Sequence, residues 1–252
     1  MRRYSNLLRQ KENDILSYLE DNEIVIFEIS EIYQAFRGRY KYSEICEALS
    51  KLNKIGHLER FEKGKYVKRG FKDQHVIGCH LAADAVVAYW SALNLHGLTE
   101  QFSNTVFMQT TKKKQNKKIF SVDYKFVKVK PAKMIGIENA GYGNHTFKMT
   151  NKEKTIIDCF DLSEYSGEFY WVMDSFVTNE WNINRLIKYC IANGNNAAIK
   201  RMGYLAESHQ MKIPDFISFA KSKVNKTINL LNPLGINKGN IISRWGLKIN
   251  EI

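Results

Sequence analysis

Acidic side chains are the first candidates for chemistry in this sequence, because carboxylates hold catalytic metal ions and move protons. A nuclease of the PD-(D/E)xK class needs an acid and, further on, an Asp or Glu that is separated from a Lys by one residue. Asp123-Tyr124-Lys125 matches only the second half of this pattern. A nucleotidyltransferase needs Gly-Ser followed by spaced aspartates, and the sequence contains no Gly-Ser. Glu153 and Asp158 are five residues apart, so on a helix they point in different directions and form no acid pair.

Histidines and cysteines are the second group of candidates. His75, Cys79 and His80 would combine as His-x3-Cys-His, which is poor spacing for zinc and lacks a second pair of ligands, so ordinary packing is the preferred interpretation. The chain has four cysteines without a Cys-x-x-Cys pair, and we expect reduced, mostly buried thiols. They are Cys46, Cys79, Cys159 and Cys190. The sequence therefore predicts a protein that is not an enzyme, with no catalytic residue, metal site or cofactor.

Basic side chains offer a different chemistry, the binding of phosphate groups. Lys and Arg number 38 against 26 Asp and Glu, which gives a formal net charge of +12 and a pI near 9.4. A field of that sign attracts polyanions such as nucleic acids. A lysine-rich, AT-rich genome, which raises the lysine content everywhere, is the alternative explanation.

The first elements of the chain are predicted from the spacing of apolar residues. Leucines and isoleucines at helical spacing predict a helix over residues 5–21, and a β-branched run predicts a short strand over 24–27. A second, short helix is expected over 31–36, with Ser30 as its N-cap.

A third helix and a hairpin complete this N-terminal module. The helix is expected to begin at Ser43 as N-cap and to end at Gly56. Its apolar stripe consists of Ile45, Leu49, Leu52 and Ile55. Alternating residues predict two strands over 57–61 and 65–68, joined by a tight turn at 62–64. This order of elements is that of a winged helix-turn-helix, whose usual role is to bind duplex DNA.

A winged helix presents the start of its third helix and its hairpin tip to one DNA groove, and cations are present at both places. The candidates for base contacts are Lys41, Tyr42 and Ser43, with Lys51 and Lys54 further along the helix. The candidates for phosphate contacts are Arg37, Arg39, Lys63 and Lys65. Glu44 and Glu47 count against this interface because phosphates repel carboxylates, although one of them could accept from a cytosine amino group. A winged helix used for protein contacts is the alternative.

The predicted fold class is α+β, with a DNA-binding domain over residues 1–72 and a mixed body over 73–252. The body is expected to be β-rich over 100–150, with a small antiparallel sheet, and helical over 151–230. A helix is predicted over 79–95 and a closing strand over 241–249. Thr150 and Glu153 form a predicted capping box for a helix over 154–160, and Asn182 caps another helix over 183–192, which ends at Gly194.

The densest positive segment of the body is 112–133, with nine lysines and one aspartate. Five of the lysines gather between two predicted strands. They are Lys112, Lys113, Lys114, Lys117 and Lys118. Such a hairpin tip is either a second phosphate-binding patch or a strand edge that lysines protect against aggregation.

Four segments of the body, in this order, form a recognisable set. They are YWSALNLHGLTE at 89–100, NKEKTIID at 151–158, KRMGYLAE at 200–207 and WGL at 245–247. Together with the winged head, they resemble the AbiEi family of antitoxins, the regulators of type IV bacterial toxin–antitoxin systems in phage defence. The likeness extends over essentially the full length. Lys200 and Lys154 stand where arginine is common in that family.

The resemblance implies a transcriptional autorepressor whose head binds inverted repeats in its own promoter. It also implies a body that counters a cognate nucleotidyltransferase toxin in an abortive-infection system, without requiring direct binding of the toxin. His96, next to Gly97, is then a structural histidine, and Arg201 is expected to pair with an acid such as Asp158. A winged-helix transcription factor without a toxin partner and a DNA-processing nuclease are the alternatives.

The N-terminal sequence bears on localisation. Residues 1–6 are polar and lead into a charged helix, and no later stretch approaches eighteen apolar residues. We therefore expect a cytoplasmic protein that does not contact a membrane.

Overall fold

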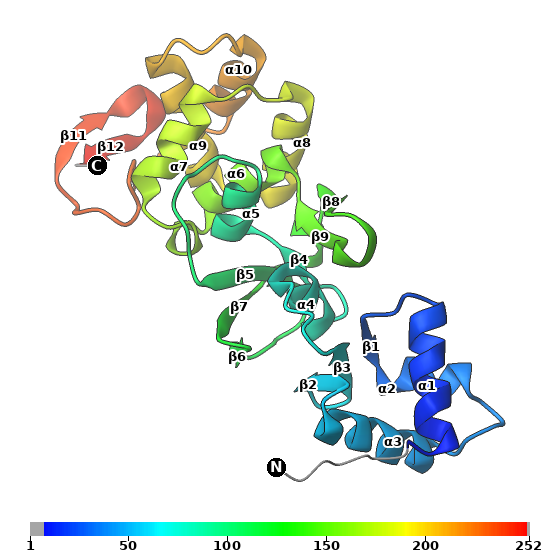
Figure 1. The fold of residues 1–252 in the computed structure, drawn as a ribbon. Coiled ribbons are helices and arrows are strands. Elements are labelled where there is room, and N and C mark those ends of the chain that lie inside the picture. The colour runs from blue at the N-terminus through cyan, green and yellow to red at the C-terminus, as the bar shows by residue number, and fades with distance from the viewer. Residues whose placement is uncertain (1–7, 251–252) are drawn as a thin grey trace. The chain divides into compact units, whose positions relative to one another are not determined.

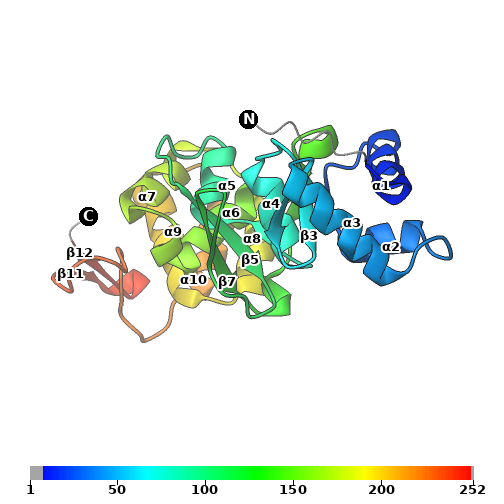
Figure 2. The ribbon, with the colours of Figure 1, turned by 60° about the horizontal axis from the view of Figure 1, so that its bottom comes forward.

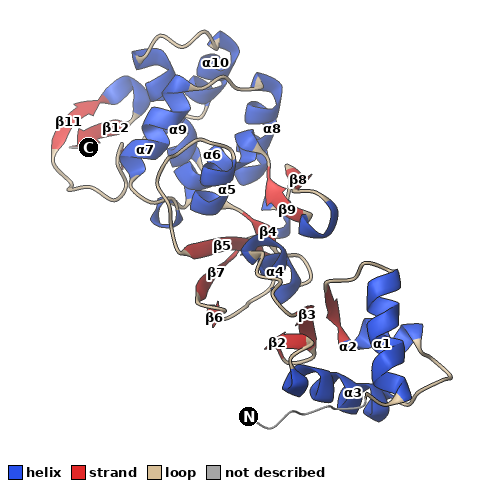
Figure 3. Cartoon of the chain, in the orientation of Figure 1, coloured by secondary structure: helices blue, strands red, loops and turns tan. Residues whose placement is uncertain are grey.

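The computed structural model describes residues 8–250 and divides into two compact units. The first unit comprises the chain up to Ile77 together with Gly141–Thr146, and the second comprises Gly78–Ala140 and Phe147–Ile252. The fold class is α+β, with helices and several small sheets (Figures 1 and 3). The sequence places the division between residues 72 and 73, whereas in the structure it falls between Ile77 and Gly78.

Between residues 8 and 72, the first unit contains three helices and a three-stranded antiparallel sheet. Its elements are α1 (Gln10–Asp21), β1 (Ile26–Glu28), α2 (Ile29–Ala35), α3 (Tyr42–Ile55), β2 (Leu58–Glu62) and β3 (Lys65–Lys68). The strands lie in the order β1-β3-β2. Residues 5–7 of the first predicted helix lie outside the described residues. The apolar faces of the three helices meet in one core around Ile15, Ile32 and Leu49.

Two predicted helix caps in this unit are wrong. The N-cap of α2 is Glu28 rather than Ser30, and the N-cap of α3 is Lys41 rather than Ser43. In both helices an acid three residues further on accepts the N–H of the capping residue: Glu31 accepts from Glu28 at 2.7 Å and Glu44 from Lys41 at 3.0 Å. A reciprocal carboxylate thus takes over part of the role of a serine cap. Gly56 ends α3 in the left-handed conformation with φ of 84°, as predicted.

The second unit contains a six-stranded sheet in the order β6-β7-β5-β4-β9-β8. Its strands are β4 (Val86–Val87), β5 (Thr105–Thr110), β6 (Lys117–Ile119), β7 (Val122–Lys128), β8 (Ile137–Ala140) and β9 (Phe147–Thr150). The predicted antiparallel sheet is wrong, because β5 pairs with β7 and β4 with β9 in parallel. The short connection from β5 to β7 favours an antiparallel prediction, but the chain uses β6 as a crossover at the sheet edge.

The prediction of a single helix over residues 79–95 is also wrong, because three elements occupy this region. These are α4 (Gln74–Leu81), β4 and α5 (Tyr89–Leu95). The run Ala85–Ala88 is fully buried, and a continuous apolar run does not distinguish a buried strand from a buried helix. Asp84 fixes the break, because its carboxylate accepts from the Thr110 hydroxyl at 2.5 Å and from the Thr111 N–H at 2.8 Å.

The helical part of the second unit covers one side of the sheet (Figures 1 and 2). Its helices are α6 (Lys152–Asp161), α7 (Phe169–Thr178), α8 (Ile183–Asn193), α9 (Asn196–Ser208) and α10 (Pro214–Ser222). Asn182 caps α8 and Gly194 ends it, as predicted. The predicted Thr150 capping box is wrong: Asn151 caps α6, and Glu153 accepts from the N–H of Asn182 at 3.0 Å.

The chain closes with a small sheet of β10 (Asn229–Leu230), β12 (Leu247–Asn250) and β11 (Gly239–Ile242), in that order. The single predicted strand over 241–249 is wrong, because a 3-10 turn, η4 (Ser243–Trp245), interrupts it. That turn buries Trp245 completely in the core of the second unit, which explains why the strand breaks there. Within the described part of the chain, every helix is too short or too polar to span a lipid bilayer.

Candidate functional site

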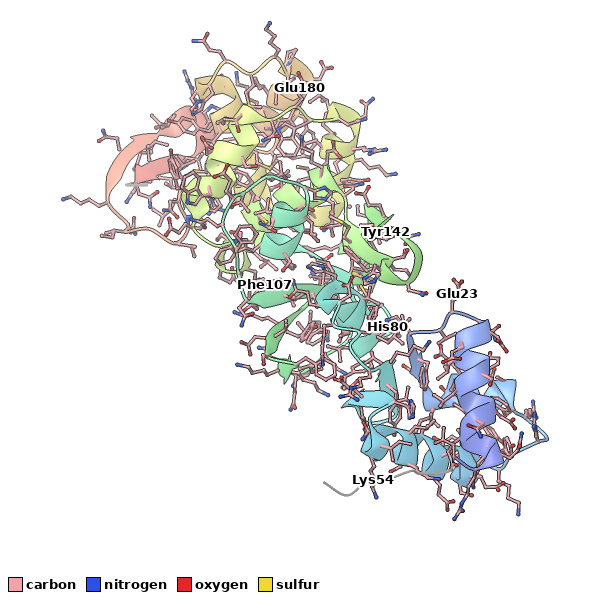
Figure 4. All side chains as sticks on the ribbon, in the orientation of Figure 1. Glu23, Lys54, His80, Phe107, Tyr142 and Glu180 are labelled. Atoms are coloured by element: carbon pink, nitrogen blue, oxygen red, sulfur yellow. The ribbon has the colours of Figure 1, made fainter. Side chains whose placement is uncertain are left out.

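The helix α3 has two faces of opposite character. Its buried face consists of Ile45, Ala48, Leu49 and Leu52, each with no exposed area. Its exposed stripe consists of Ser43, Glu47, Ser50 and Lys54, at spacings of four, three and four residues. Ser50 was not among the predicted site residues, although the helical period that places the apolar stripe also places Ser50 opposite it. Lys54 points outward near the end of α3 (Figure 4).

The start of α3 carries the three predicted base contacts. Lys41, Tyr42 and Ser43 are all exposed. The Tyr42 ring remains 51% exposed and meets the ring of Tyr33 edge-on, with centroids 5.3 Å apart. The packing of Tyr42 against Tyr33 of α2 restricts its ring, so that Tyr42 presents its hydroxyl and ring edge at the N-terminal end of α3.

The two acids of α3 are held by a cation of α1. Lys11 Nζ lies 3.8 Å from Glu44 and 3.6 Å from Glu47. The Lys41 N–H and, to a lesser degree, Lys11 hold the pKa of Glu44 below its usual range. The positive charge of Lys11 therefore reduces the repulsion between these two glutamates and a DNA phosphate. The sequence alone does not reveal this contact between α1 and α3.

Three of the predicted DNA-contacting cations are engaged in ion pairs within the unit. Arg39 lies 2.5 Å from Asp14, and Lys51 lies 3.1 Å from Glu12. Lys65 lies 2.9 Å from Glu28 and also contacts Glu62 at 3.6 Å. These pairs tie α3 and the hairpin to neighbouring elements. Arg39 and Lys65 as phosphate contacts, and Lys51 as a base contact, would therefore compete with an internal carboxylate.

The other predicted cations are open to solvent. Arg37, Lys41, Lys54 and Lys63 are exposed, and no carboxylate among the described residues pairs with them. Lys63 lies at the hairpin tip, where Gly64 adopts φ of 79° and its carbonyl accepts from the N–H of Ile29 at 2.9 Å. The tip is short and is held against the start of α2, which fixes the position of Lys63.

The lysine cluster of the second unit lies at the β5–β6 loop and on β6. Lys112, Lys113 and Lys118 are exposed, whereas Lys114 and Lys117 are half-buried. The strand β6 is an edge of the six-stranded sheet, which is where protective lysines are expected. A phosphate-binding role for the exposed members is equally compatible with this position.

The Asp123-Tyr124-Lys125 segment lies on β7, next to that cluster. Asp123 lies 3.9 Å from Lys118 at the edge of the sheet. Lys125 Nζ lies over the Tyr165 ring, 5.0 Å from its centroid. Among the described residues, no group of three or more His, Cys, Asp or Glu side chains is arranged to hold a metal ion.

The motif residues of the body have structural partners. His96 Nε2 lies 2.8 Å from the carbonyl of Thr150, so this histidine has a structural contact, which joins two distant segments of the unit. The predicted pair between Arg201 and Asp158 is wrong. Arg201 Nε donates to the carbonyl of Leu230 at 2.8 Å, and Asp158 pairs with Lys154 one helical turn away.

Comparisons with known proteins place the fold but not the function. No family model matches the sequence, and no curated protein matches it significantly. Among solved structures, the crystal structure of the RV2827C protein from Mycobacterium tuberculosis has a similar fold, with a TM-score of 0.63 at 13% sequence identity. The match covers 95% of this chain and 91% of the other. At this identity the match shows a shared α+β fold alone.

Proposed function

We propose that the first unit is a winged helix-turn-helix that binds duplex DNA. The order helix, strand, helix, helix, hairpin and the antiparallel order β1-β3-β2 support this proposal. In such a module the third helix enters the major groove, with its N-terminal residues near the base edges. Here that helix is α3, whose start carries Lys41, Tyr42 and Ser43.

The observation that carries the proposal is the exposed polar stripe of α3 between unpaired cations. Ser43 and Ser50 offer hydroxyls that donate or accept, and Lys54 offers a donor, so this face suits hydrogen bonding to base edges. Arg37 and Lys63 lie in the turn before α3 and at the hairpin tip, where they would contact phosphates and set the register of the helix.

We further propose that the whole protein is a cytoplasmic, non-enzymatic autorepressor and antitoxin that counters a nucleotidyltransferase toxin in an abortive-infection system. The resemblance of the four segments to the AbiEi family supports this role. Lys200 and Arg201 of the third segment, with Lys154 and Asp158 of the second, are buried in the second unit, so these motif residues shape the body rather than its surface.

The DNA-binding proposal is tested with Lys41→Ala, Tyr42→Ala and Ser50→Ala, measured on the upstream intergenic duplex and on random DNA. Each substitution should weaken binding to the intergenic duplex more than to random DNA, by roughly five- to a hundredfold for a lost base contact. Lys212→Gln, which removes an exposed lysine of the second unit, is the matched control. Equal losses on both duplexes would show that α3 does not read bases.

The antitoxin proposal is tested by co-expression with the product of an adjacent nucleotidyltransferase gene. Cells should survive with the wild-type protein and with the α3 variants, because DNA binding and toxin control are assigned to different units. If the cells die with the wild-type protein and also with the α3 variants, the result would support the alternative of a transcription factor without a toxin partner. Metal-dependent nicking of plasmid DNA that Asp123→Ala abolishes would instead support the nuclease alternative.

A further inference from the structure

A polar cavity lies in the second unit, between segments that are far apart in the sequence. Its volume is about 780 Å³, and its walls come from residues 128–133, 161–162, 192–197 and 225–229. Cavities of this size hold small organic ligands, whereas an inorganic ion needs much less space. Neither DNA binding nor toxin control accounts for this cavity.

The lining of the cavity is positively charged. Three lysines, Lys128, Lys130 and Lys133, line it together with a single acid, Asp161. Lys133 lies 2.5 Å from Asp161, whose carboxylate also accepts from Asn193 at 3.0 Å and from Asn195 at 2.8 Å. Lys128 and Lys130 are exposed, and no carboxylate in the described residues pairs with them. Two positive charges of the wall are therefore uncompensated.

Two buried cations lie behind the same wall. Lys200 Nζ donates to the carbonyl of Thr227 at 2.7 Å and to the side chain of Asn225 at 3.3 Å, and both of these residues line the cavity. Arg201 donates to the carbonyls of Leu230 and Phe160. Within the described residues neither cation pairs with a carboxylate, and burial lowers the pKa of both, that of Arg201 to about 10. Asp161 opposes this effect at Arg201, whereas no carboxylate of the described chain acts on Lys200, so the buried pair adds to the positive field in the adjacent cavity.

The cavity also offers neutral hydrogen-bonding groups. The side-chain amides of Asn196 and Asn229 line it and have no hydrogen-bond partner among the described residues. A carboxamide both donates and accepts, which suits it to the edge of a nucleobase or to the hydroxyls of a ribose. A bare anion would leave these groups and most of the volume unused.

We propose that this cavity binds a nucleotide, with its phosphate at Lys128 and Lys130 and its nucleoside against the carboxamide wall. The positive wall supplies charge-assisted hydrogen bonds to phosphate oxygens. The buried Lys200 and Arg201 act through the field and by holding the 225–230 segment in place.

The test is isothermal titration of the full chain with AMP and UMP, with adenosine and inorganic phosphate as partial ligands. The nucleotides should bind, and the two partial ligands should bind at least roughly tenfold more weakly, since each lacks one half of the contacts. Equal binding of inorganic phosphate would overturn the nucleotide assignment, and so would equal binding of adenosine. A short RNA that binds where AMP and UMP do not would also overturn it.

Variants locate the site. Lys128→Gln combined with Lys130→Gln should weaken nucleotide binding roughly tenfold or more, because two charge-assisted contacts are lost, while the exposed positions leave the fold intact. Asn196→Asp places a negative charge in the cavity and should weaken binding further. Lys212→Gln, outside the lining, should bind as the wild type does. Unchanged affinity in the double variant would show that nucleotides bind elsewhere.

Discussion

Lys154 and Asp158 form a buried ion pair in the second unit. Both side chains lie one turn apart on α6 and are essentially without exposed area. In addition to its pair with Lys154, the Asp158 carboxylate accepts a hydrogen bond from the side-chain amide of Gln109 at 3.2 Å. Replacing Lys154 by Met keeps an unbranched apolar side chain of similar size and removes the ammonium group, with its charge and its N–H donors. The remaining carboxylate would then be buried with one neutral donor, and such a loss costs about 3–5 kcal/mol of unfolding free energy.

The cost should depend on pH, because the carboxyl can escape it by protonation. Burial raises the pKa of Asp158, an effect that Lys154 opposes, so removing the lysine raises it further. A group whose folded pKa lies above its unfolded value of about 3.9 loses stability as the pH rises. In Lys154→Met, the deficit should therefore grow as the pH rises, by at most about 1.4 kcal/mol per pH unit.

Urea unfolding measured by tryptophan fluorescence is a suitable assay, because all four tryptophans, at 90, 171, 181 and 245, belong to the second unit. The double variant Lys154→Met with Asp158→Asn removes both charges and keeps a partner for Gln109. It should recover most of the loss and show little pH dependence. A single-variant deficit below about 1 kcal/mol, or additive effects in the double variant, would refute the account of the buried pair.

Three further predictions concern other contacts. Gly203→Ala should destabilise the second unit by about 1–3 kcal/mol in the same assay, because a Cβ there would lie 2.4 Å from the Ala220 Cβ and 2.6 Å from the Trp245 ring. Burial raises the pKa of Cys159, and it raises that of Cys190 to about 12, so at pH 8 only the half-buried Cys46 and Cys79 should react with a thiol reagent before unfolding. The Tyr40 hydroxyl donates to Asp14 and holds the pKa of that carboxyl low, so the destabilisation caused by Tyr40→Phe should be smaller at pH 3 than at pH 6, measured by circular dichroism during unfolding.

Periodicity predicts much of the first unit, because the period of the buried face also fixes the exposed one. Gly56 in this unit and Gly194 in the second unit end their helices as predicted. Both adopt the left-handed backbone conformation, which glycine takes without steric cost. The cap residues were harder to predict. Glu31 and Glu44 accept the N–H groups of Glu28 and Lys41 and so favour these residues as caps over the nearby serines, and the local sequence does not decide between the two arrangements.

The second unit departs further from sequence-based expectation because its contacts are non-local. The apolar run at 85–88 becomes a strand only because β5 and β9 lie on either side of it. The direction of β7 relative to β5 depends on a crossover that no short motif encodes. In the candidate site, partners such as Glu12 for Lys51 are 39 residues apart, so the sequence identified the cations but not which of them are free.

If the first unit carries a cationic surface that binds duplex DNA, a salt titration of the wild-type protein with the upstream intergenic duplex should reveal it. With Arg37, Lys41, Lys54 and Lys63 each on one phosphate, log K should fall linearly with log salt, with a slope of roughly −3.6 per protein copy. Charge-removing substitutions at these positions should flatten the slope by about 0.9 for each contact. The absence of any salt-sensitive complex with this duplex would contradict the claim.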